Sequence, residues 1–269
     1  MNGRVLIVAG SDSGGGAGIQ GDLKTVTALG GYAATAITAL TAQNTQGVFG
    51  ILDVEPTFIA QQMQLVLDDI GADCIKIGML HNKAVIDTVA TVLEEHATSI
   101  PLVVDPVMFA KGGAALLDPN ACNTLIARLI PKATVLTPNT EEATALGGIT
   151  ITDITAMEQA GQHLLAQGAQ AVLIKGGHLT GDTVTNLLIS QQGTERFVTP
   201  RLATVHTHGT GCTLASAVAT GLAQGLSLKT AVSRALAYVY EAIRTAPGLG
   251  QGQGPLNHGH TIRPFPEQS

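Results

Sequence analysis

The sequence has few charged residues and no long apolar run. Only 13% of its 269 residues are Asp, Glu, Lys or Arg, and the net charge is −6. Without a basic excess the chain has no surface that would attract a nucleic acid, so we expect no such partner. No apolar segment is long enough to span a membrane, and the apolar run that ends at Ala9 is too short for a signal-peptide core. We therefore expect a cytoplasmic protein that has no membrane partner.

Cysteines and phosphate-binding motifs are also scarce. The three cysteines are far apart and form no CxxC pair: Cys74, Cys122 and Cys212. This argues against a disulfide framework and a structural zinc site. No GxxxxGKS/T motif occurs, which excludes a P-loop fold. A formal GxGxxG match at 16–21 starts several residues past the first expected strand, and no acid follows the next strand, so we do not expect dinucleotide binding.

The rest of the sequence alternates short apolar runs with helical patterns. With 45% apolar residues, the chain can bury a large core. We expect strands at 5–9, 33–40, 74–77, 102–104, 134–136 and 171–174. We expect helices at 18–29, 56–70, 83–96, 120–129, 154–167, 213–224 and 228–244. This alternation predicts a largely parallel sheet covered by helices on both faces.

The organisation of the chain is simple. Neither an internal repeat nor a composition break marks a linker, so we expect residues 1–269 to form one domain. Two strand-like runs between 184 and 198 flank a turn at 191–194, which predicts a hairpin at the sheet edge. The glycine-rich tail at 248–269 is expected to be irregular, with His258 and His260 solvated rather than bound to a metal.

The most informative segment is 207–213, Thr-His-Gly-Thr-Gly-Cys-Thr, where a loop becomes a long apolar helix. N–H groups in the first turn of a helix lack intrahelical partners, and with the helix dipole they favour an anion such as a phosphoryl group. Gly209 and Gly211 would let the backbone approach that anion closely. The dipole is also expected to make the Cys212 thiolate easier to form. An ordinary glycine-rich helix start with a small buried thiol explains the same residues equally well.

Ligands of a parallel sheet bind beyond the carboxyl ends of its strands, so polar residues that follow the strands are candidates for a site. Asn139 and Glu142 follow the strand at 134–136, and the carboxylate could hold Mg²⁺ directly or through water. Their spacing is also that of a capping box, and both roles are compatible. Lys175 follows the strand at 171–174 and is either a point charge on a phosphate or a lysine that snorkels from a strand end.

Several segments together resemble one known family. Five separated segments match it in order between residues 6 and 213, and the segment 254–258 matches as well. The segment 207–213 resembles the anion-hole motif of the ribokinase-like superfamily, and His208 and Thr213 point to its hydroxymethylpyrimidine and phosphomethylpyrimidine kinase branch. The resemblance implies a three-layer α/β/α sandwich with a mostly parallel central sheet. One departure, the triplet Gly14-Gly15-Gly16 where serine or proline often precedes two glycines, concerns loop stiffness rather than chemistry.

The resemblance also implies roles for the phosphate-binding residues. Sugar kinases of the superfamily carry an aspartate as catalytic base where this chain has Cys212, and a thiol there is a feature of vitamin kinases that phosphorylate hydroxymethyl groups on pyrimidine or pyridine rings. The residues implied for the anion hole are Gly209, Thr210 and Gly211. Those implied for Mg²⁺ are Glu142, Asn139 and, through water, Asp105. Those implied for the nucleotide are Lys175, Asn139 and Thr213.

On the substrate side, the resemblance places Gln43 of the segment 41–45 on the position that reads a pyrimidine. A side-chain amide offers a donor and an acceptor, which suits the ring nitrogen and amino group of an aminopyrimidine. Spacing alone would assign this amide to nearby backbone. Met79 and Val107 match apolar positions that sandwich the ring, although each could equally be core. The other positions implied on the substrate side are Gly10, Asp22 and Thr41.

The resemblance therefore implies a homodimeric kinase that uses ATP with Mg²⁺. Its substrate would be 4-amino-5-hydroxymethyl-2-methylpyrimidine and then the monophosphate of that alcohol, in thiamine biosynthesis. Two alternatives stay open at this point. One is a pyridoxal or pyridoxine kinase with the same machinery, and the other is a pyrimidine-binding protein without activity, which the presence of Cys212 and Glu142 disfavours.

Overall fold

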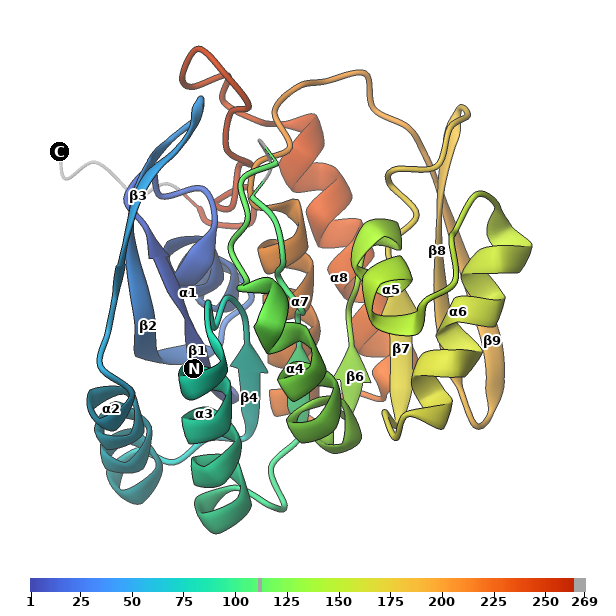
Figure 1. Cartoon of the computed structure of the whole chain (residues 1–269). Coiled ribbons are helices and arrows are strands. Elements are labelled where there is room, and N and C mark those ends of the chain that lie inside the picture. The colour runs from blue at the N-terminus through green and yellow to red at the C-terminus, as the bar shows by residue number, and fades with distance from the viewer. Residues whose placement is uncertain (111–112, 264–269) are drawn as a thin grey trace, which may run out of the picture.

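The computed structural model describes residues 1–110 and 113–263. Within these ranges the centre is a nine-stranded sheet in the order β3-β2-β1-β4-β5-β6-β7-β8-β9 (Figure 1). The strands are β1 (Arg4–Asp12), β2 (Tyr32–Asn44), β3 (Gly47–Asp53), β4 (Cys74–Ile77), β5 (Leu102–Val104), β6 (Val135–Leu136), β7 (Ala171–Ile174), β8 (Thr183–Ser190) and β9 (Gly193–Pro200). The pairs from β2 to β7 are parallel. The pairs β2·β3, β7·β8 and β8·β9 are antiparallel.

Helices cover both faces of the sheet, as predicted. One layer contains α1 (Gly18–Ala28), α7 (Thr210–Ala223) and α8 (Leu228–Arg244). The other contains α2 (Pro56–Asp69), α3 (Lys83–His96), α4 (Cys122–Arg128), α5 (Thr140–Gly147) and α6 (Ile154–Ala166), with 3-10 turns at Pro119–Ala121 and Ile130–Lys132 (Figure 1). The predicted three-layer α/β/α architecture is therefore confirmed. No helix in the described part of the chain is long and apolar enough to cross a membrane.

The strand β1 shows why both faces must be covered. Leu6 and Val8 belong to the apolar cluster under α2 to α6, whereas Val5 and Ile7 belong to the cluster under α1, α7 and α8. Successive side chains of a strand point to opposite faces, and all four are buried. A strand that is apolar on both faces gains stability only between two layers, so the apolar runs of the sequence lead directly to this fold.

Most element bounds agree with the sequence prediction. The strands β4, β5 and β7 and the helices α3 and α8 have the predicted bounds, and β8 with β9 forms the predicted edge hairpin. The sequence analysis misses β3, which lies at the other edge, mostly exposed and without a clean alternation of buried residues. It also misses α5, whose eight residues are too few to establish a helical period. The helix α7 begins at Thr210, three residues earlier than predicted, because its first turn has no apolar residue to mark it.

The tail after α8 contains no helix or strand between 248 and 263, and residues 264–269 of the predicted tail lie outside the described ranges. The prediction that its histidines are solvated is wrong. His258 is buried, and its Nε2 lies 3.0 Å from the hydroxyl of Thr213 in α7. The Tyr238 hydroxyl donates a 2.5 Å hydrogen bond to the His258 carbonyl, and the half-buried His260 ring lies against the Tyr238 ring. The tail therefore folds back over α7 and α8.

Candidate active site

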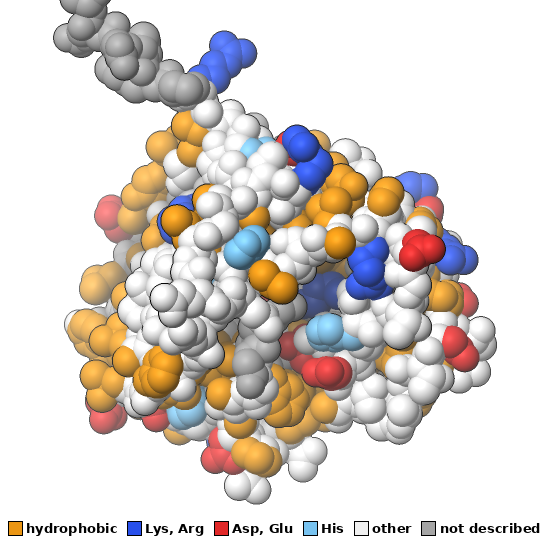
Figure 2. Space-filling model, turned by 90° about the horizontal axis from the view of Figure 1, so that it is seen from above, with side chains coloured by type: hydrophobic (Ala, Val, Ile, Leu, Met, Phe, Trp, Pro, Cys, Tyr) orange, Lys and Arg blue, Asp and Glu red, His pale blue; other side chains and the backbone are white. Residues whose placement is uncertain are grey.

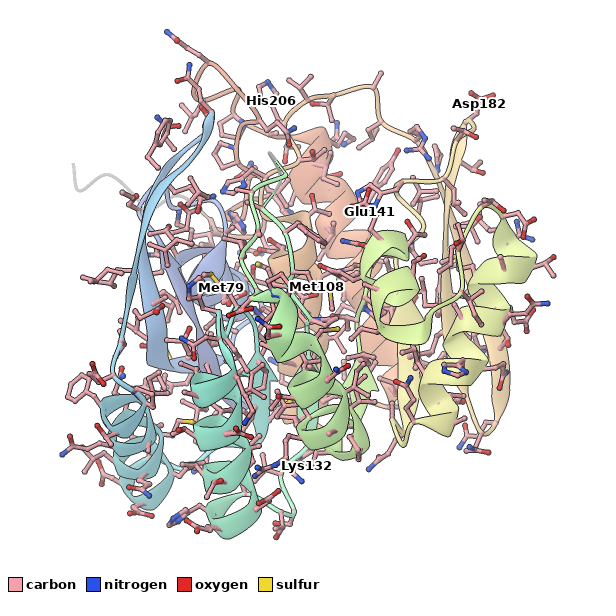
Figure 3. The ribbon with its side chains drawn as sticks, in the orientation of Figure 1. Met79, Met108, Lys132, Glu141, Asp182 and His206 are labelled. Carbon is pink, nitrogen blue, oxygen red and sulfur yellow. The ribbon has the colours of Figure 1, made fainter. Side chains whose placement is uncertain are left out.

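A cavity of about 780 Å³ opens at the carboxyl ends of the parallel strands. Its walls come from the loops that follow the strands and from the first turn of α7. Figure 2 looks down on this end of the molecule and shows basic, acidic and histidine side chains around a hollow. Met79 and Glu141 belong to its wall, whereas Lys132 lies at the opposite end of the sheet (Figure 3). The site therefore lies where a parallel sheet is expected to place it.

The first turn of α7 is fixed by a close backbone contact. Gly209 caps this helix with a φ of 85°, a conformation that side chains other than glycine rarely adopt. A Cβ atom at Gly209 would lie 1.9 Å from the carbonyl oxygen of Gly16. The Thr210 hydroxyl donates a 2.7 Å hydrogen bond to the Thr207 carbonyl and holds the loop that leads into the helix. The start of α7, where the anion hole is predicted, thus contains a glycine that no other residue can replace without strain.

Cys212 lies in this first turn and lines the cavity. Its thiol does not have the lowered pKa that the helix dipole predicts. Burial raises the pKa of Cys212 to about 12, and the carboxylates of Asp22 and Asp105 act in the same direction. Only the ammonium of Lys76 opposes them strongly. The sequence analysis considered the dipole but not desolvation, which is the larger effect here.

Charged side chains from three strand ends meet next to α7. The Lys175 ammonium lies 2.9 Å from Asp105 Oδ1 and 3.9 Å from Glu142 Oε2. The Thr137 hydroxyl donates a 3.1 Å hydrogen bond to the same Asp105 oxygen. A Cβ atom at Gly211 would lie 3.1 Å from Lys175 Nζ, so the glycine lets the ammonium approach the helix start. The predicted phosphate side of the site is therefore assembled around Lys175.

Asn139 and Glu142 form the predicted capping box. The Asn139 amide oxygen accepts a 2.9 Å hydrogen bond from the Glu142 N–H, and Glu142 Oε2 accepts a 2.8 Å hydrogen bond from the Asn139 N–H. Burial raises the pKa of Glu142 to about 7 although the charge on Lys175 opposes the rise. The second carboxylate oxygen takes no part in the cap. The capping role and a ligand role are thus compatible in this geometry.

The ring side of the cavity is lined by neutral groups. Gln43 accepts a 3.1 Å hydrogen bond from the Thr41 hydroxyl, and its amide nitrogen lies 3.4 Å from Nε2 of His208. Met79 and Val107 supply apolar wall. A Cβ atom at Gly10 would lie 3.1 Å from the sulfur of Met79, so this glycine leaves room for the thioether. These predicted substrate positions therefore share one wall of the cavity.

Asp12 also lines the cavity, although the sequence analysis does not single it out. Its carboxylate accepts hydrogen bonds from the N–H groups of Gly14 and Ala17, at 2.8 Å each, and lies 2.8 Å from Nε2 of His208. Burial opposes the charge, but these partners hold the pKa of Asp12 below its usual value. The pair ties the glycine loop after β1 to the loop before α7. A carboxylate two residues before the first of three consecutive glycines was the available signal.

Two predicted residues do not line the cavity. Asp22, expected to face the ring, is fully buried, with its carboxylate 2.8 Å from Lys76 Nζ and 2.7 Å from the Ser216 hydroxyl. Thr213, expected at the nucleotide, is also fully buried, and its hydroxyl is occupied by His258. Both side chains point into the helix layer because α1 and α7 pack there against each other. The predicted residues that do line the cavity are Gly10, Thr41, Gln43, Met79, Asp105, Val107, Asn139, Glu142, Lys175, Gly209, Thr210, Gly211 and Cys212.

Comparison with known proteins places this geometry in one family. The family model described as "Phosphomethylpyrimidine kinase" matches residues 12–257. The thiamine biosynthesis bifunctional protein ThiED of Geobacter sulfurreducens is 52% identical over 95% of this chain, which spans 52% of that longer relative. The hydroxymethylpyrimidine/phosphomethylpyrimidine kinase of Streptomyces coelicolor is 48% identical over 96% of this chain and 95% of its own length.

Solved structures give the same result for the fold. A pyridoxal kinase from Staphylococcus aureus in complex with ADP is 36% identical, with a TM-score of 0.90 over 98% of this chain and 96% of that chain. A phosphomethylpyrimidine kinase from Clostridium difficile is 40% identical, with a TM-score of 0.80 over 89% of this chain and 99% of that chain. The architecture described above is therefore shared with kinases of both ring types.

Proposed function

The chain belongs to the phosphomethylpyrimidine kinase family, and on this premise we propose that it transfers the γ-phosphoryl group of ATP to 4-amino-5-hydroxymethyl-2-methylpyrimidine and then to its monophosphate. This is a kinase function of thiamine biosynthesis on a ribokinase-like fold. One observation carries the assignment of the site: a single cavity holds Gln43 on its neutral wall and Cys212 at the start of α7. A ring alcohol that pairs with Gln43 thus shares one space with a thiol whose ionised form, the thiolate, can take its proton.

The residues of the chain divide the reaction among them. Phosphoryl transfer depends mainly on positioning and on stabilisation of negative charge. The N–H groups of Gly209 to Cys212 would surround the charge that develops on the transferred group, and Lys175 would neutralise part of it. Cys212 would take the hydroxyl proton as the substrate oxygen bonds to phosphorus and ADP leaves.

Magnesium is implied by the family, and the donor set of this site fits it. Mg²⁺ prefers oxygen ligands and is usually held by one or two carboxylates together with water and phosphate oxygens. Asp105 and Glu142 supply two buried carboxylates on one wall of the cavity, and Asn139 adds an amide. The described residues contain no group of three or more His, Cys, Asp or Glu side chains that could hold a metal alone. We therefore propose that these three residues hold Mg²⁺ with ATP, where it would neutralise phosphate charge.

The direct test is an assay of products. Purified protein is mixed with magnesium ATP and, separately, with the hydroxymethylpyrimidine, its monophosphate, and pyridoxal. The products are weighed by mass spectrometry. We expect the mono- and diphosphate of the pyrimidine. If neither pyrimidine gains a phosphoryl group while pyridoxal does, the proposed substrate is wrong.

Pyridoxal is a second candidate because of one specific observation. The pyridoxal kinases of known structure superpose on almost the whole chain, with TM-scores of 0.89 and 0.90. A pyridine with a hydroxymethyl group has a shape similar to that of the pyrimidine. We nevertheless favour the pyrimidine because the curated relatives named as pyrimidine kinases reach 52% and 48% identity, against 36% for that pyridoxal kinase.

We also propose that the protein forms the homodimer that the family resemblance implies. The edge strand β3 leaves one row of backbone groups unpaired within the described sheet, and exposed apolar side chains surround it. These side chains are Tyr32, Leu40, Phe49, Leu52, Phe58 and Leu65. Light scattering should give twice the monomer mass for the wild type. It should give the monomer mass for Leu52→Lys, and a monomeric wild type would contradict the proposal.

A further inference from the structure

Lys76 lies in the middle of the buried strand β4, where a charged residue is not expected. Its side chain is fully buried, and its neighbours in the strand are apolar. The side chain nevertheless reaches the floor of the cavity, where it lines the same space as Cys212. A Cβ atom at Gly78 would lie 2.9 Å from Lys76 Nζ, so a glycine makes room for the ammonium. None of the steps derived above uses this lysine.

A buried anion keeps Lys76 charged. Asp22 of α1 lies 2.8 Å from its ammonium, and Ser216 of α7 donates a 2.7 Å hydrogen bond to the other oxygen of the same carboxylate. All three side chains are buried. Burial alone would lower the pKa of Lys76, but the charges of Asp22, Cys212 and Asp105 together outweigh burial and raise that pKa above its usual value. A strand and two helices therefore meet in one charged cluster.

Stability does not explain this cluster. Two charges taken out of water lose much hydration energy, and a buried ion pair can often be replaced by apolar residues with no loss of stability. The cluster does, however, lie directly below the proposed base. Ser216 follows Cys212 by four residues in α7, so both lie on the same face of that helix. The cluster is thus positioned to act on the thiol.

The charges around Cys212 favour a role for Lys76 in particular. Asp22 and Asp105 disfavour a negative charge on the sulfur, and Lys76 favours it. Lys175 also interacts with the sulfur, but Lys76 has the larger effect on the thiol. Lys76 is therefore the charge that most strongly opposes the effect of burial on the pKa of Cys212.

We propose that Lys76, held in place and charged by Asp22 and Ser216, is a positioning residue that sustains the thiolate of Cys212 as the base for phosphoryl transfer. The substrate hydroxyl gives its proton to the Cys212 sulfur, its oxygen bonds to the γ-phosphorus, and the bond from that phosphorus to the bridging oxygen of ADP breaks. Lys76 keeps its protons throughout. The inference rests on the proposed function for its role in turnover, but the charge relation can be measured without substrate.

The experiment measures the alkylation of Cys212 by iodoacetamide as a function of pH. Cys122→Ser serves as the parent, because Cys74 is fully buried, and Cys212→Ser in that parent gives the blank. At a fixed pH below the midpoint of the Cys212 titration, Lys76→Met should lower the alkylation rate by about tenfold. Only the thiolate reacts, and the fraction of Cys212 that is ionised falls. Lys83→Met removes an exposed lysine on α3 and should change nothing.

A second variant separates the effect of the Lys76 charge from that of the Asp22 carboxylate, which the loss of Lys76 leaves buried without its partner. Lys76→Met combined with Asp22→Asn removes both charges, so it should fold even where the single variant does not. Its alkylation rate should lie between those of the parent and Lys76→Met, about threefold below the parent. If the double variant matches the parent while circular dichroism shows a folded chain, Lys76 does not sustain the thiolate.

Turnover gives the final comparison. In Lys76→Met, kcat for the pyrimidine should fall while KM changes little, and the rise of kcat with pH should move to higher pH. A purely structural role would instead lower kcat and raise KM without moving the pH profile. If alkylation changes as expected but the parent phosphorylates no pyrimidine, the proposed function fails and the assigned charge relation stands. If kcat and its pH profile stay at the values of the parent, the role of Lys76 in turnover is refuted.

Discussion

The two walls of the cavity differ in the kind of side chain that they present. The phosphate wall brings together Lys175, Asp105 and Glu142, with Lys76 below them. The ring wall presents an amide, a hydroxyl and apolar groups, with the Asp12–His208 pair beside the amide. A transferred phosphoryl group changes its charge distribution during the reaction, so preorganised charges accelerate it. A neutral ring gains more from neutral hydrogen-bonding groups, so the contrast predicts that the first wall governs kcat and the second governs KM.

The largest effect should follow from Cys212→Ala. Loss of a general base typically lowers turnover by ~10²- to 10⁴-fold, or roughly 3 to 5 kcal/mol in the activation barrier. Folding and pyrimidine binding should stay nearly intact, because the substitution removes one small side chain whose hydrogen bond is with the backbone of Gly18. Steady-state kinetics will measure this, with Cys122→Ala as the control. A near-normal kcat would mean that the anion hole alone carries catalysis.

Substitution of His258 tests the contact between the tail and Thr213 at the start of α7. Burial, together with the nearby charge of Lys24, lowers the pKa of His258 to about 4. The neutral form is thus favoured in the folded chain. Its contribution to the free energy of unfolding is complete above pH 6.5 and is lost as the pH falls towards 4. This difference corresponds to about 3 kcal/mol of unfolding free energy.

Urea titrations at several pH values between 4 and 7 will measure that loss. His258→Gln should be less stable than the wild type at neutral pH, but its stability should fall less over this window. His163→Gln, at an exposed histidine, should follow the wild type. Parallel curves for His258→Gln and the wild type would show that the tail histidine does not titrate in this way.

Gln43→Ala tests the ring wall. An aminopyrimidine presents a donor beside an acceptor, and the loss of a matched partner leaves buried polar groups unsatisfied at about 1 to 3 kcal/mol each. At saturating magnesium ATP, we expect KM for the pyrimidine to rise at least about tenfold, with a much smaller change for pyridoxal. The control is Gln192→Ala in the exposed hairpin turn. An equal loss on both alcohols would remove Gln43 as the residue that reads the ring.

The smallest effect should come from Glu142→Gln. A neutral amide attracts a hard cation less strongly than a carboxylate does, so the Mg²⁺ concentration for half-maximal activity should rise several-fold, up to about tenfold. Glu141→Gln changes the neighbouring, exposed carboxylate and should have a weaker effect. An unchanged magnesium titration of Glu142→Gln would leave that residue only its capping role.

Local patterns in the sequence predict the sheet, most helices and the turn that carries Cys212, because periodicity and glycine positions are properties of short segments. The pairing of Asp22 with Lys76 could not be predicted in this way. The two residues are 54 positions apart and meet only because α1 packs on the face of the sheet to which Lys76 of β4 points. The pKa of Cys212 depends in the same way on burial by distant segments, and a helix-dipole argument alone gives the wrong direction.

The C-terminal tail has a consequence for the order in which the protein matures. The N–H of His208 donates a 3.1 Å hydrogen bond to the Gly254 carbonyl, and His258 contacts Thr213. The support of the predicted anion hole thus includes residues 254–258, which are synthesised after every strand and helix of the described chain. A ribosome adds about 5 to 20 residues per second, and the sheet can begin to form while the tail is still inside it. A nascent chain therefore lacks these contacts until residues 254–258 have left the ribosome.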